Sequence, residues 1–255
     1  MADLISGLNC RAIVYELIDD NEKIHSAHKS DIMVTERWLI NRADLIVTTA
    51  SRLHEKVKNI NQNKETILVG NGVEYDFFNK DFFKKPKELE GMKKIAGYVG
   101  SIDSWIDFET IQFMADSRED LSFVFVGPIK VEHLPSGKNI HFLGRKDYDS
   151  VPDYCSCFDA CLIPFTAGEF ADTINPVKLY EYFALGKPVI SYYMKELDPF
   201  SEVLYQAEDK RDFLKKLDLA LTEDDEDIKL KRKKLARLND WSVKAKTLQD
   251  ALSKL

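Results

Sequence analysis

Long apolar runs are missing from this 255-residue chain, and none approaches the roughly 20 consecutive residues that a membrane-spanning helix needs. The first residues, MADLISGLNCR, lack a basic segment followed by an apolar core, so we expect no secretory signal and a cytosolic protein. Hydrophobic residues make up 44% and charged residues 31%, which is typical of a soluble globular protein.

Metal-ligand patterns are also scarce. Cys155, Cys157 and Cys161 have the spacing C-x-C-x3-C, but no fourth Cys or His lies near them in the sequence. We therefore expect buried, reduced thiols rather than a zinc site. No H-E-x-x-H or similar cluster is formed by the five histidines, His25, His28, His54, His133 and His141.

Net positive charge is absent as well. The formal charge of −7 argues against nucleic acid as a general partner. Acidic residues gather at 223–227 and basic residues at 229–234. The basic run is able to dock on an anionic membrane face, with a solvated helix face as the alternative.

Strand and helix patterns alternate along the chain, which predicts an α/β fold with parallel sheets and right-handed crossovers. The first series predicts strands at 10–19, 44–51 and 66–73 and helices at 34–43 and 51–60, the second helix capped by Ser51. The second series predicts strands at 94–101, 122–128, 139–145, 159–165 and 187–193, and helices at 107–117, 150–158, 175–186, 209–221 and 229–255.

These elements divide the chain into four parts. Residues 1–73 supply too few strands for a complete domain and form a partial N-terminal Rossmann-like domain. Residues 74–93 are charged, contain proline and read as a connector. Residues 94–208 form a complete C-terminal doubly wound domain. Residues 209–255 are C-terminal helices, the last of which we expect to pack back toward the N-terminal domain.

The most informative segment is TINPVKLYEYFALGKP, residues 173–188. Asn175 is a suitable N-cap, Pro176 suits the first helical position, and Gly186 suits the C-terminal stop. Since the predicted helix follows strand 159–165, its N-terminus faces the crevice at the carboxyl ends of the strands. Free N–H groups and the positive dipole end at this place suit a diphosphate.

Lys178 and Glu181 are three residues apart and share a face of this helix. Lys178 can neutralise phosphate charge, and an ionised Glu181 can accept two hydrogen bonds from a ribose diol. The alternative is a well-capped helix with an exposed Lys–Glu pair, and the spacing alone does not decide between them.

Two loops on the same rim are further candidates. Gly97 and Gly100 in GYVGSIDSW do not make a G-x-G-x-x-G fingerprint, but a glycine at a strand end lets the backbone approach a phosphate. A tight turn without a ligand is the alternative. Arg145 in FLGRKDY follows a strand end and is either a ligand contact or a solvated loop residue.

Six segments together carry a family resemblance: NGVEYDFF, IAGYVGSIDSW, FVFVGP, HFLGRKDYDSVPDY, FDACLIPF and NPVKLYEYFALGKPV. In this order they resemble family 4 glycosyltransferases of the GT-B fold, above all bacterial enzymes of teichuronic acid and surface polysaccharide biosynthesis. The resemblance covers residues 10–250 and implies two facing Rossmann-like domains. It implies that the C-terminal domain holds a nucleotide sugar, that the N-terminal domain holds the acceptor, and that the sugar is transferred with retention and without a metal.

The resemblance also implies residue roles. Glu181 would bind the ribose, while the glutamate that normally contacts the sugar eight positions earlier is replaced by Thr173. No cation lies in the loop 101–105, where the family often has an Arg and a Lys, so Lys178 and the helix end would bind more of the anion. The expected donor-binding residues are Gly100, Ser101, Arg145, Thr173, Asn175, Pro176, Val177, Lys178 and Glu181.

On the acceptor side, the resemblance implies a catalytic or positioning group after the strand at 12–18, where Asp19 and Asp20 lie. Either would orient or deprotonate an acceptor hydroxyl, and a plain pair of surface aspartates is the alternative. Asp225 and Asp227 have the Asp-x-Asp spacing of metal-dependent transferases but sit in an acidic helix start. We expect no metal and no cofactor.

Compared with the family, the N-terminal part is short. The chain is therefore expected to be a fragment, one half of a split enzyme whose second chain supplies the missing strands, or a non-catalytic relic. We expect a retaining transferase that uses a UDP- or GDP-linked sugar and a surface-polysaccharide or lipid-linked acceptor, in the cytoplasm or at the inner membrane face. The alternatives are a non-catalytic nucleotide-sugar-binding or scaffold subunit and a nucleotide-sugar epimerase.

Overall fold

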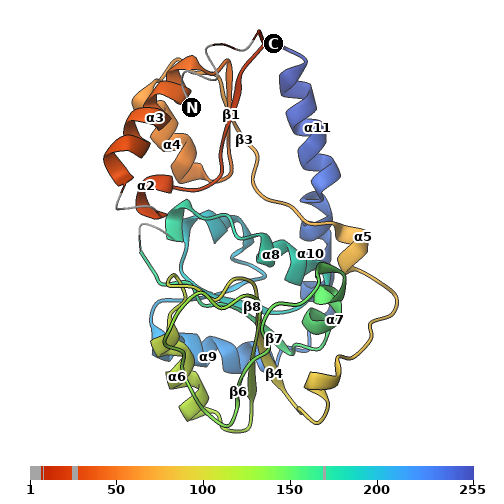
Figure 1. The fold of residues 1–255 in the computed structure, drawn as a ribbon. Coiled ribbons are helices and arrows are strands. Elements are labelled where there is room, and N and C mark those ends of the chain that lie inside the picture. Colours follow the sequence, from red (N-terminus) through yellow and green to blue (C-terminus); the bar gives the residue numbers. More distant parts are fainter. Residues whose placement is uncertain (1–6, 8, 25–27, 169–170) are drawn as a thin grey trace. The chain divides into compact units, whose positions relative to one another are not determined.

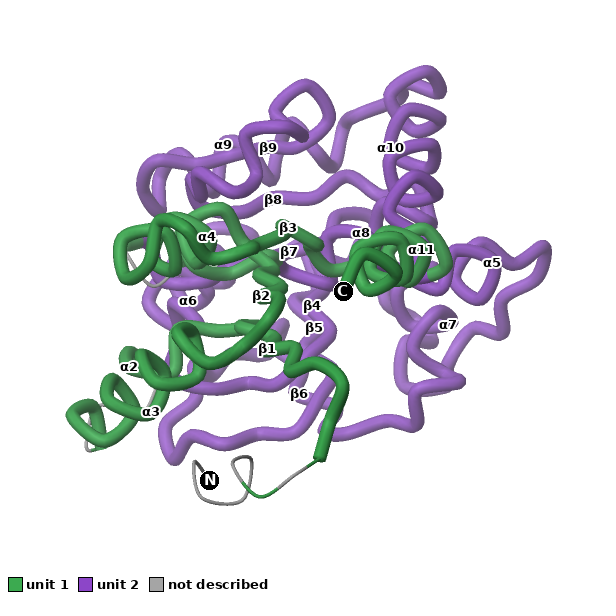
Figure 2. The backbone as a smooth tube through the Cα atoms, turned by 90° about the horizontal axis from the view of Figure 1, so that it is seen from above, with its two compact units in different colours: residues 1–71, 168–175, 242–255 green, residues 72–167, 176–241 purple. Residues whose placement is uncertain are grey.

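The computed structural model describes residues 7, 9–24, 28–168 and 171–255, and these form two compact units. Unit 1 contains the described residues within 1–71, 168–175 and 242–255, and unit 2 contains residues 72–167 and 176–241 (Figure 2). Every pair of neighbouring strands in both units is parallel, as the alternation of strands and helices predicted.

Unit 1 is built on a three-stranded sheet in the order β1–β2–β3. The strands are β1 (Val14–Leu17), β2 (Leu45–Thr48) and β3 (Thr66–Leu68). The helical elements are α2 (Asn21–Ile24), α3 (Lys29–Arg42), α4 (Ser51–Ile60), η4 (Ala171–Thr173) and α11 (Trp241–Leu252), the last from Ser242 onward. In register, Tyr15 lies opposite Ile46, and Ile46 lies opposite Thr66.

The core of unit 1 lies between this sheet and helices α3 and α4. Its side chains are fully or almost fully buried and belong to Leu17, Ile40, Ala43, Ile46, Ala50, Leu53 and Val57. Leu53 and Val57 are four residues apart and so face the sheet together. The predicted cap at Ser51 is wrong, because α4 begins at Ser51 itself and the capping position is occupied by Ala50, whose methyl group cannot accept a hydrogen bond.

Unit 2 contains a six-stranded sheet in the order β6–β5–β4–β7–β8–β9. Its strands are β4 (Ile95–Val99), β5 (Ser122–Val126), β6 (Ile140–Phe142), β7 (Ala160–Ile163), β8 (Val189–Tyr192) and β9 (Tyr205–Ala207). The short strand β9 was not predicted, because a segment of three residues, Tyr205, Gln206 and Ala207, is too short to give an alternating pattern. Two half-sheets thus grow in opposite directions from β4 and β7, which is the strand order of dinucleotide-binding domains.

Helices cover both sides of this sheet. In Figure 1, α8 and α10 lie on one side of the strands, and α6 and α9 lie on the other. The helices are α5 (Tyr75–Phe78), α6 (Phe108–Ser117), α7 (Val151–Ser156), α8 (Val177–Ala184), α9 (Lys210–Leu221) and α10 (Glu226–Leu238), with short 3-10 segments η2 (Lys87–Leu89), η3 (Tyr148–Ser150) and η5 (Lys195–Phe200). Residues 74–93, expected as a connector, therefore contain α5 and η2.

The helix predicted over 229–255 is broken into α10 and α11 at Asn239 and Asp240. Backbone groups at this point bond to an earlier segment instead of continuing the helix. The Val73 N–H donates to the Asn239 carbonyl at 3.1 Å, and the Trp241 N–H donates to the Val73 carbonyl at 3.0 Å. The Asp240 carboxylate also accepts the Tyr75 N–H at 2.9 Å. This long-range pairing leaves no signal in the local helical pattern.

Candidate functional site

The strand order of unit 2 reverses between β4 and β7. In open parallel sheets, the crevice outside the carboxyl ends of the strands at such a switch point is the usual ligand site. Gly100 directly follows β4, and the chain that leaves β7 leads to α8. The fold of unit 2 therefore brings the Gly100 loop and the start of α8 to the place where a ligand is expected.

Helix α8 begins at Val177, with Pro176 at the capping position and no side-chain cap. The predicted N-cap at Asn175 is wrong. The Asn175 side-chain oxygen accepts the Asn71 backbone N–H at 3.0 Å, and the Asn175 carbonyl accepts a hydrogen bond from Asn71 Nδ2 at 2.5 Å. Within the part of the chain that the structure describes, no side chain caps the N-terminal N–H groups of α8, so they remain available to an anion.

The C-terminal end of α8 agrees with the prediction. Gly186 has a φ of 70°, its N–H donates to the Phe183 carbonyl at 2.8 Å, and the Lys187 N–H donates to the Tyr182 carbonyl at 3.0 Å. Gly186 thus ends the helix in the left-handed conformation that glycine adopts at little cost. At the other side of α8, the Tyr182 hydroxyl accepts the Val99 N–H at 2.8 Å and so ties the helix to the end of β4.

Lys178 and Glu181 both lie in the first turns of α8, and Glu181 is only 9% exposed. Burial raises the pKa of Glu181, and the nearby charge of Lys178 partly opposes the rise. Burial likewise lowers the pKa of Lys178, against the charges of Glu181 and Cys155. Among the described residues, neither head group forms a hydrogen bond or an ion pair. The two opposite charges therefore lie close together, and the hydrogen-bonding atoms of both side chains are available to a ligand.

The Lys178 side chain crosses directly over Gly100. A Cβ atom placed at Gly100 would lie 2.0 Å from Lys178 Cε, and the φ of this glycine is 148°. The ammonium group lies 5.6 Å from the centre of the Tyr98 ring. Only glycine leaves room for the lysine at this strand end, so the Gly100 turn and the α8 cation form one arrangement.

Glycines also follow the neighbouring strands β5 and β6. Gly127, with a φ of 150°, follows β5, and a Cβ there would lie 1.9 Å from the Gly100 carbonyl oxygen. The Gly100 N–H donates to the Val126 carbonyl at 2.8 Å, and the Gly127 N–H donates to the Gly144 carbonyl at 2.9 Å. This packing brings the loops after β4, β5 and β6 together at one edge of the sheet.

Ser101 adds an unsatisfied polar group to this edge. Its Oγ atom is buried and has no hydrogen-bond partner among the described residues, while its carbonyl accepts the Tyr98 hydroxyl at 3.0 Å. A buried hydroxyl without a partner is costly and therefore points to an external partner. Gly100, Ser101, Lys178 and Glu181 are the predicted donor residues that the fold of unit 2 brings together.

Arg145 lies on the loop after β6 and is exposed. Tyr148, which sequence reasoning did not single out, lies in η3, three residues further along the chain. Burial and the charge of Glu181 raise the pKa of Tyr148, and its ring stacks on Phe77 at a centroid distance of 5.1 Å. The aromatic residue in FLGRKDY was visible in the sequence, but nothing local indicated its stacking partner, which is 71 positions away (148 − 77).

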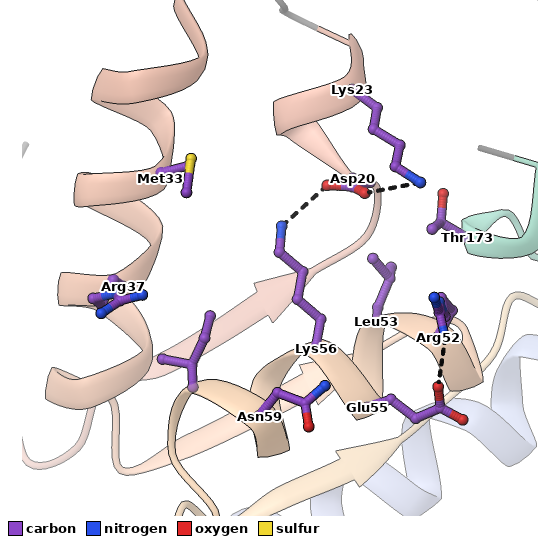
Figure 3. Close-up of a pocket in the computed structure, with 11 residues that line it drawn as sticks. Asp20, Lys23, Met33, Arg37, Arg52, Leu53, Glu55, Lys56, Asn59 and Thr173 are labelled. Carbon is purple, nitrogen blue, oxygen red and sulfur yellow. Dashed lines mark hydrogen bonds and ion pairs between the residues drawn. The ribbon is translucent and has the colours of Figure 1, made fainter. Parts of the chain in front are cut away.

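Four of the predicted residues, Asp19, Asp20, Thr173 and Asn175, belong to unit 1. Thr173, in η4, is 2% exposed, and Asn175 is 6% exposed. Asp20 follows β1 and is also buried, with its carboxylate 3.0 Å from Lys56 Nζ (Figure 3). Asp19 is half-buried, and burial raises the pKa of its carboxyl group.

Lys56 of α4 holds three carboxylates at once. Its ammonium lies 3.0 Å from Asp20, 2.8 Å from Glu22 and 2.5 Å from Glu36. Beside this cluster lies a cavity of about 470 Å³, whose lining includes Asp20, Lys56 and Thr173. Figure 3 shows Arg37 and Met33 of α3 on one side of this cavity and Arg52 of α4 below Thr173. The end of β1 therefore faces a cavity within unit 1 that several charged side chains line.

In the described part of the chain, from which His25 is excluded, no group of three or more His, Cys, Asp or Glu side chains is arranged to hold a metal ion. The cysteines are free thiols, with Cys155 and Cys161 buried and Cys157 half-buried. Across the described residues, every helix is too short or too polar to span a bilayer.

The sequence profile of the family described as Glycosyl transferases group 1 matches residues 93–223, which is the part that contains the unit 2 site. The chain belongs to this family. It is also 29% identical over 226 residues to TuaH of Bacillus subtilis (strain 168), a protein named as a teichuronic acid biosynthesis glycosyltransferase. That alignment covers 83% of the chain and 57% of the relative, so the chain spans little more than half of the relative's length.

Solved structures show which fold the chain has. A sucrose-phosphate synthase from Thermosynechococcus elongatus matches with a TM-score of 0.77 and 14% identity, covering 99% of this chain and 70% of that one. Anabaena HepE, in complex with UDP and glucose, matches with a TM-score of 0.74 and 14% identity, covering 96% and 72%. At this identity the similarity establishes the fold, which is of the GT-B type, as predicted.

Proposed function

We propose that this chain is a retaining glycosyltransferase, or the donor-binding part of one, that transfers a sugar from a UDP- or GDP-linked donor. The observation that supports this most strongly is the placement of Lys178 and Glu181. Both are charged groups in the first turns of α8, both are shifted in pKa by burial, and both lack a hydrogen-bond partner among the described residues. Buried charged groups without hydrogen-bond partners are typical of functional sites when they lie where the strand order of a parallel sheet reverses.

The donor diphosphate is assigned to the N-terminal end of α8. Uncapped N–H groups and the helix dipole attract anions there, and the Lys178 ammonium adds a full positive charge. Gly100 permits close backbone approach, and the buried Ser101 hydroxyl is available to donate a hydrogen bond. These groups would stabilise the negative charge that develops on the leaving diphosphate, with no metal ion required.

Glu181 is assigned to the ribose. Its carboxylate has two oxygen acceptors and would receive hydrogen bonds from a vicinal diol, which anchors the nucleoside. Anabaena HepE, which has the same fold, is described in complex with UDP and glucose. Tyr148 and Arg145, on the loop after β6, are assigned to the nucleobase side of the donor.

The acceptor side is assigned to unit 1. Asp19, whose pKa burial raises, is suited to accept a proton from an acceptor hydroxyl, while Asp20 is already paired with Lys56 and would position the loop. The resemblance to the teichuronic acid relative supports a surface-polysaccharide or lipid-linked acceptor. Same-face attack on the anomeric carbon would then give retention.

Donor binding to a Glu181→Gln variant tests this proposal. We expect calorimetry at neutral pH to show donor binding weakened by about tenfold or more, since a hydrogen bond to a charged group contributes roughly 1.5–3 kcal/mol. We expect the free energy of unfolding to rise at the same time, because burial disfavours the ionised carboxylate in the folded chain. Glu119→Gln, at an exposed loop position, is the matched control and should change neither quantity.

The pH dependence of donor affinity gives a second readout. The Glu181 carboxyl group must be ionised for both of its oxygens to accept hydrogen bonds from the diol, and its pKa is raised above the ordinary value of 4.5. As the pH is lowered, donor affinity should therefore begin to fall at a higher pH than it would if Glu181 had an ordinary pKa. The Glu181→Gln variant should not show this fall, because its side chain does not titrate. Unchanged donor affinity in Glu181→Gln would refute the assignment of the ribose site.

A further inference from the structure

Unit 2 contains an apolar groove of about 310 Å³ on the side of α10, away from the donor residues. Its walls include Phe200 from η5, Val203 from the following loop, and Leu235 and Leu238 from α10. Leu238 is 59% exposed, so the groove is continuous with an apolar surface. Exposed apolar surface that continues into a groove is a feature of interaction sites.

The lysines of α10 divide into two groups. Lys229 and Lys233 lie against the end of α8, 2.5 Å and 3.3 Å from the position that a Gly186 Cβ would take, and Lys229 also pairs with Glu226 at 3.0 Å. Lys231 and Lys234 instead line the groove, are exposed, and form no hydrogen bond or ion pair within the described residues. Two ammonium groups are therefore left for an external anion.

Charge and apolar surface alternate along the outer face of α10. Leu230, Lys234 and Leu238 follow one another at intervals of four residues and so form one stripe. Leu230 is 61% exposed, the highest exposure among the leucines described. Exposed leucines on both sides of a lysine, next to an apolar groove, match the composition of an interfacial helix face.

We propose that this surface, formed by Leu230, Lys231, Lys234, Leu238 and the groove beside them, docks on an anionic phospholipid bilayer. The leucines would enter the boundary between headgroups and acyl chains, and the groove would take apolar lipid surface. Lys231 and Lys234 would bind lipid phosphates, against the one carboxylate in the groove lining, Glu202.

The net negative charge of the chain restricts attraction to an anionic membrane to a local basic surface. With a net charge of −7, most of the molecule is repelled by an anionic membrane, so attraction must come from a local basic patch. The exposed lysines of α10 provide such a patch beside apolar side chains. Docking through it would orient unit 2 on the membrane, a property that goes beyond sugar transfer and does not depend on it.

Vesicle sedimentation with the full chain, without donor or acceptor, tests the proposal. We expect binding to vesicles of phosphatidylcholine with about 30% phosphatidylglycerol and little binding to phosphatidylcholine alone, because each lysine near an anionic surface contributes measurably. Lys231→Glu/Lys234→Glu should lower the partition coefficient by about tenfold or more. Lys215→Glu/Lys216→Glu on α9 changes the charge equally on another face and should leave most of the binding intact.

Substitution of an exposed leucine distinguishes binding to a membrane from binding to another polyanion. Leu238→Ser should weaken vesicle binding, whereas Leu219→Ser, which replaces a leucine that is 54% exposed on α9, should not. Far-ultraviolet circular dichroism confirms that each variant is folded. Absence of binding to anionic vesicles, equal loss in the two lysine pairs, or equally tight binding to heparin without any effect of Leu238→Ser would each overturn the proposal.

Discussion

At the residue scale, the donor region keeps groups that stability alone does not favour. Glu181 and Lys178 are shifted toward their neutral forms by burial, and Ser101 keeps a buried hydroxyl without a partner among the described residues. Each of these costs folding free energy unless a ligand supplies the missing hydrogen bonds or charge. Their concentration at the end of β4 and the start of α8 therefore supports the proposal that the donor binds at this edge of the sheet.

Gly100 is the residue through which this arrangement is most easily disturbed. Gly100→Ala places a methyl group 2.0 Å from Lys178 Cε and strains a φ of 148°. We expect a loss of about 1–3 kcal/mol in the free energy of unfolding and a loss of donor affinity, because the lysine must move. Urea denaturation and calorimetry measure the two effects.

Gly91→Ala is the matched control for this substitution. Gly91 also has a positive φ, 83°, but no atom lies within 4 Å of the added Cβ. It should show the backbone strain alone, with donor affinity unchanged. Equal donor affinity in the Gly100 and Gly91 variants would contradict the role given to the Gly100 turn.

At the element scale, α8 depends on α10, which packs against it. The position of α10 is determined in turn by Arg232, which is fully buried. Its guanidinium donates to both carboxylate oxygens of Glu223 and, through Nε at 2.8 Å, to the Val203 carbonyl. A planar guanidinium suits this fork of acceptors, so the pair joins α10 to the loop before β9 and to the end of α9.

Removal of this guanidinium should loosen α10. We expect Arg232→Met to lower the free energy of unfolding by about 3–5 kcal/mol, because the Glu223 carboxylate would lose its cationic partner and keep only the hydrogen bond from the Tyr205 hydroxyl. Arg118→Met breaks surface pairs with Asp120 and Asp218 and should cost no more than about 1 kcal/mol. Thermal and urea unfolding of the two variants compare the costs, and similar losses would show that the Arg232 pair does not hold α10.

At the scale of the whole molecule, the two units have unequal cores. Unit 1 has a three-stranded sheet and unit 2 a six-stranded one, and the proposed donor groups Gly100, Ser101, Lys178 and Glu181 all belong to unit 2. A ligand that binds one folded unit stabilises that unit by mass action. The location of the donor site can therefore be read from which unit a nucleotide stabilises.

We expect UDP at about 100 times its dissociation constant to raise the free energy of unfolding of unit 2 by about 2.7 kcal/mol. Hydrogen exchange followed by mass spectrometry should show slower exchange in peptides from β4 and α8. Peptides from β2 and α4 serve as the internal comparison and should change little. Protection confined to β2 and α4 would place the nucleotide in unit 1 and contradict the proposed donor site.

Much of this fold was readable from local pattern. Parallel strands, the helix that stops at Gly186, and the family were all predictable, because hydrophobic periodicity, glycine stops and short motifs act over a few residues. Lys178 and Glu181 were singled out for the same reason, since their spacing places them on one helix face. Prediction failed at Ser51 because α4 begins one residue earlier than its expected cap allows. At Asn175 and Asn239 it failed because another segment had taken the hydrogen bonds.

By itself, then, the sequence determined which residue types stand at the strand ends and helix starts. The tertiary structure decided which of them meet. Lys178 reaches over Gly100, Tyr148 stacks on Phe77, and Asp20 pairs with Lys56, 36 positions further along the chain. Such contacts depend on how sheets and helices pack in three dimensions, and no local periodicity encodes a distance between residues so far apart in the chain.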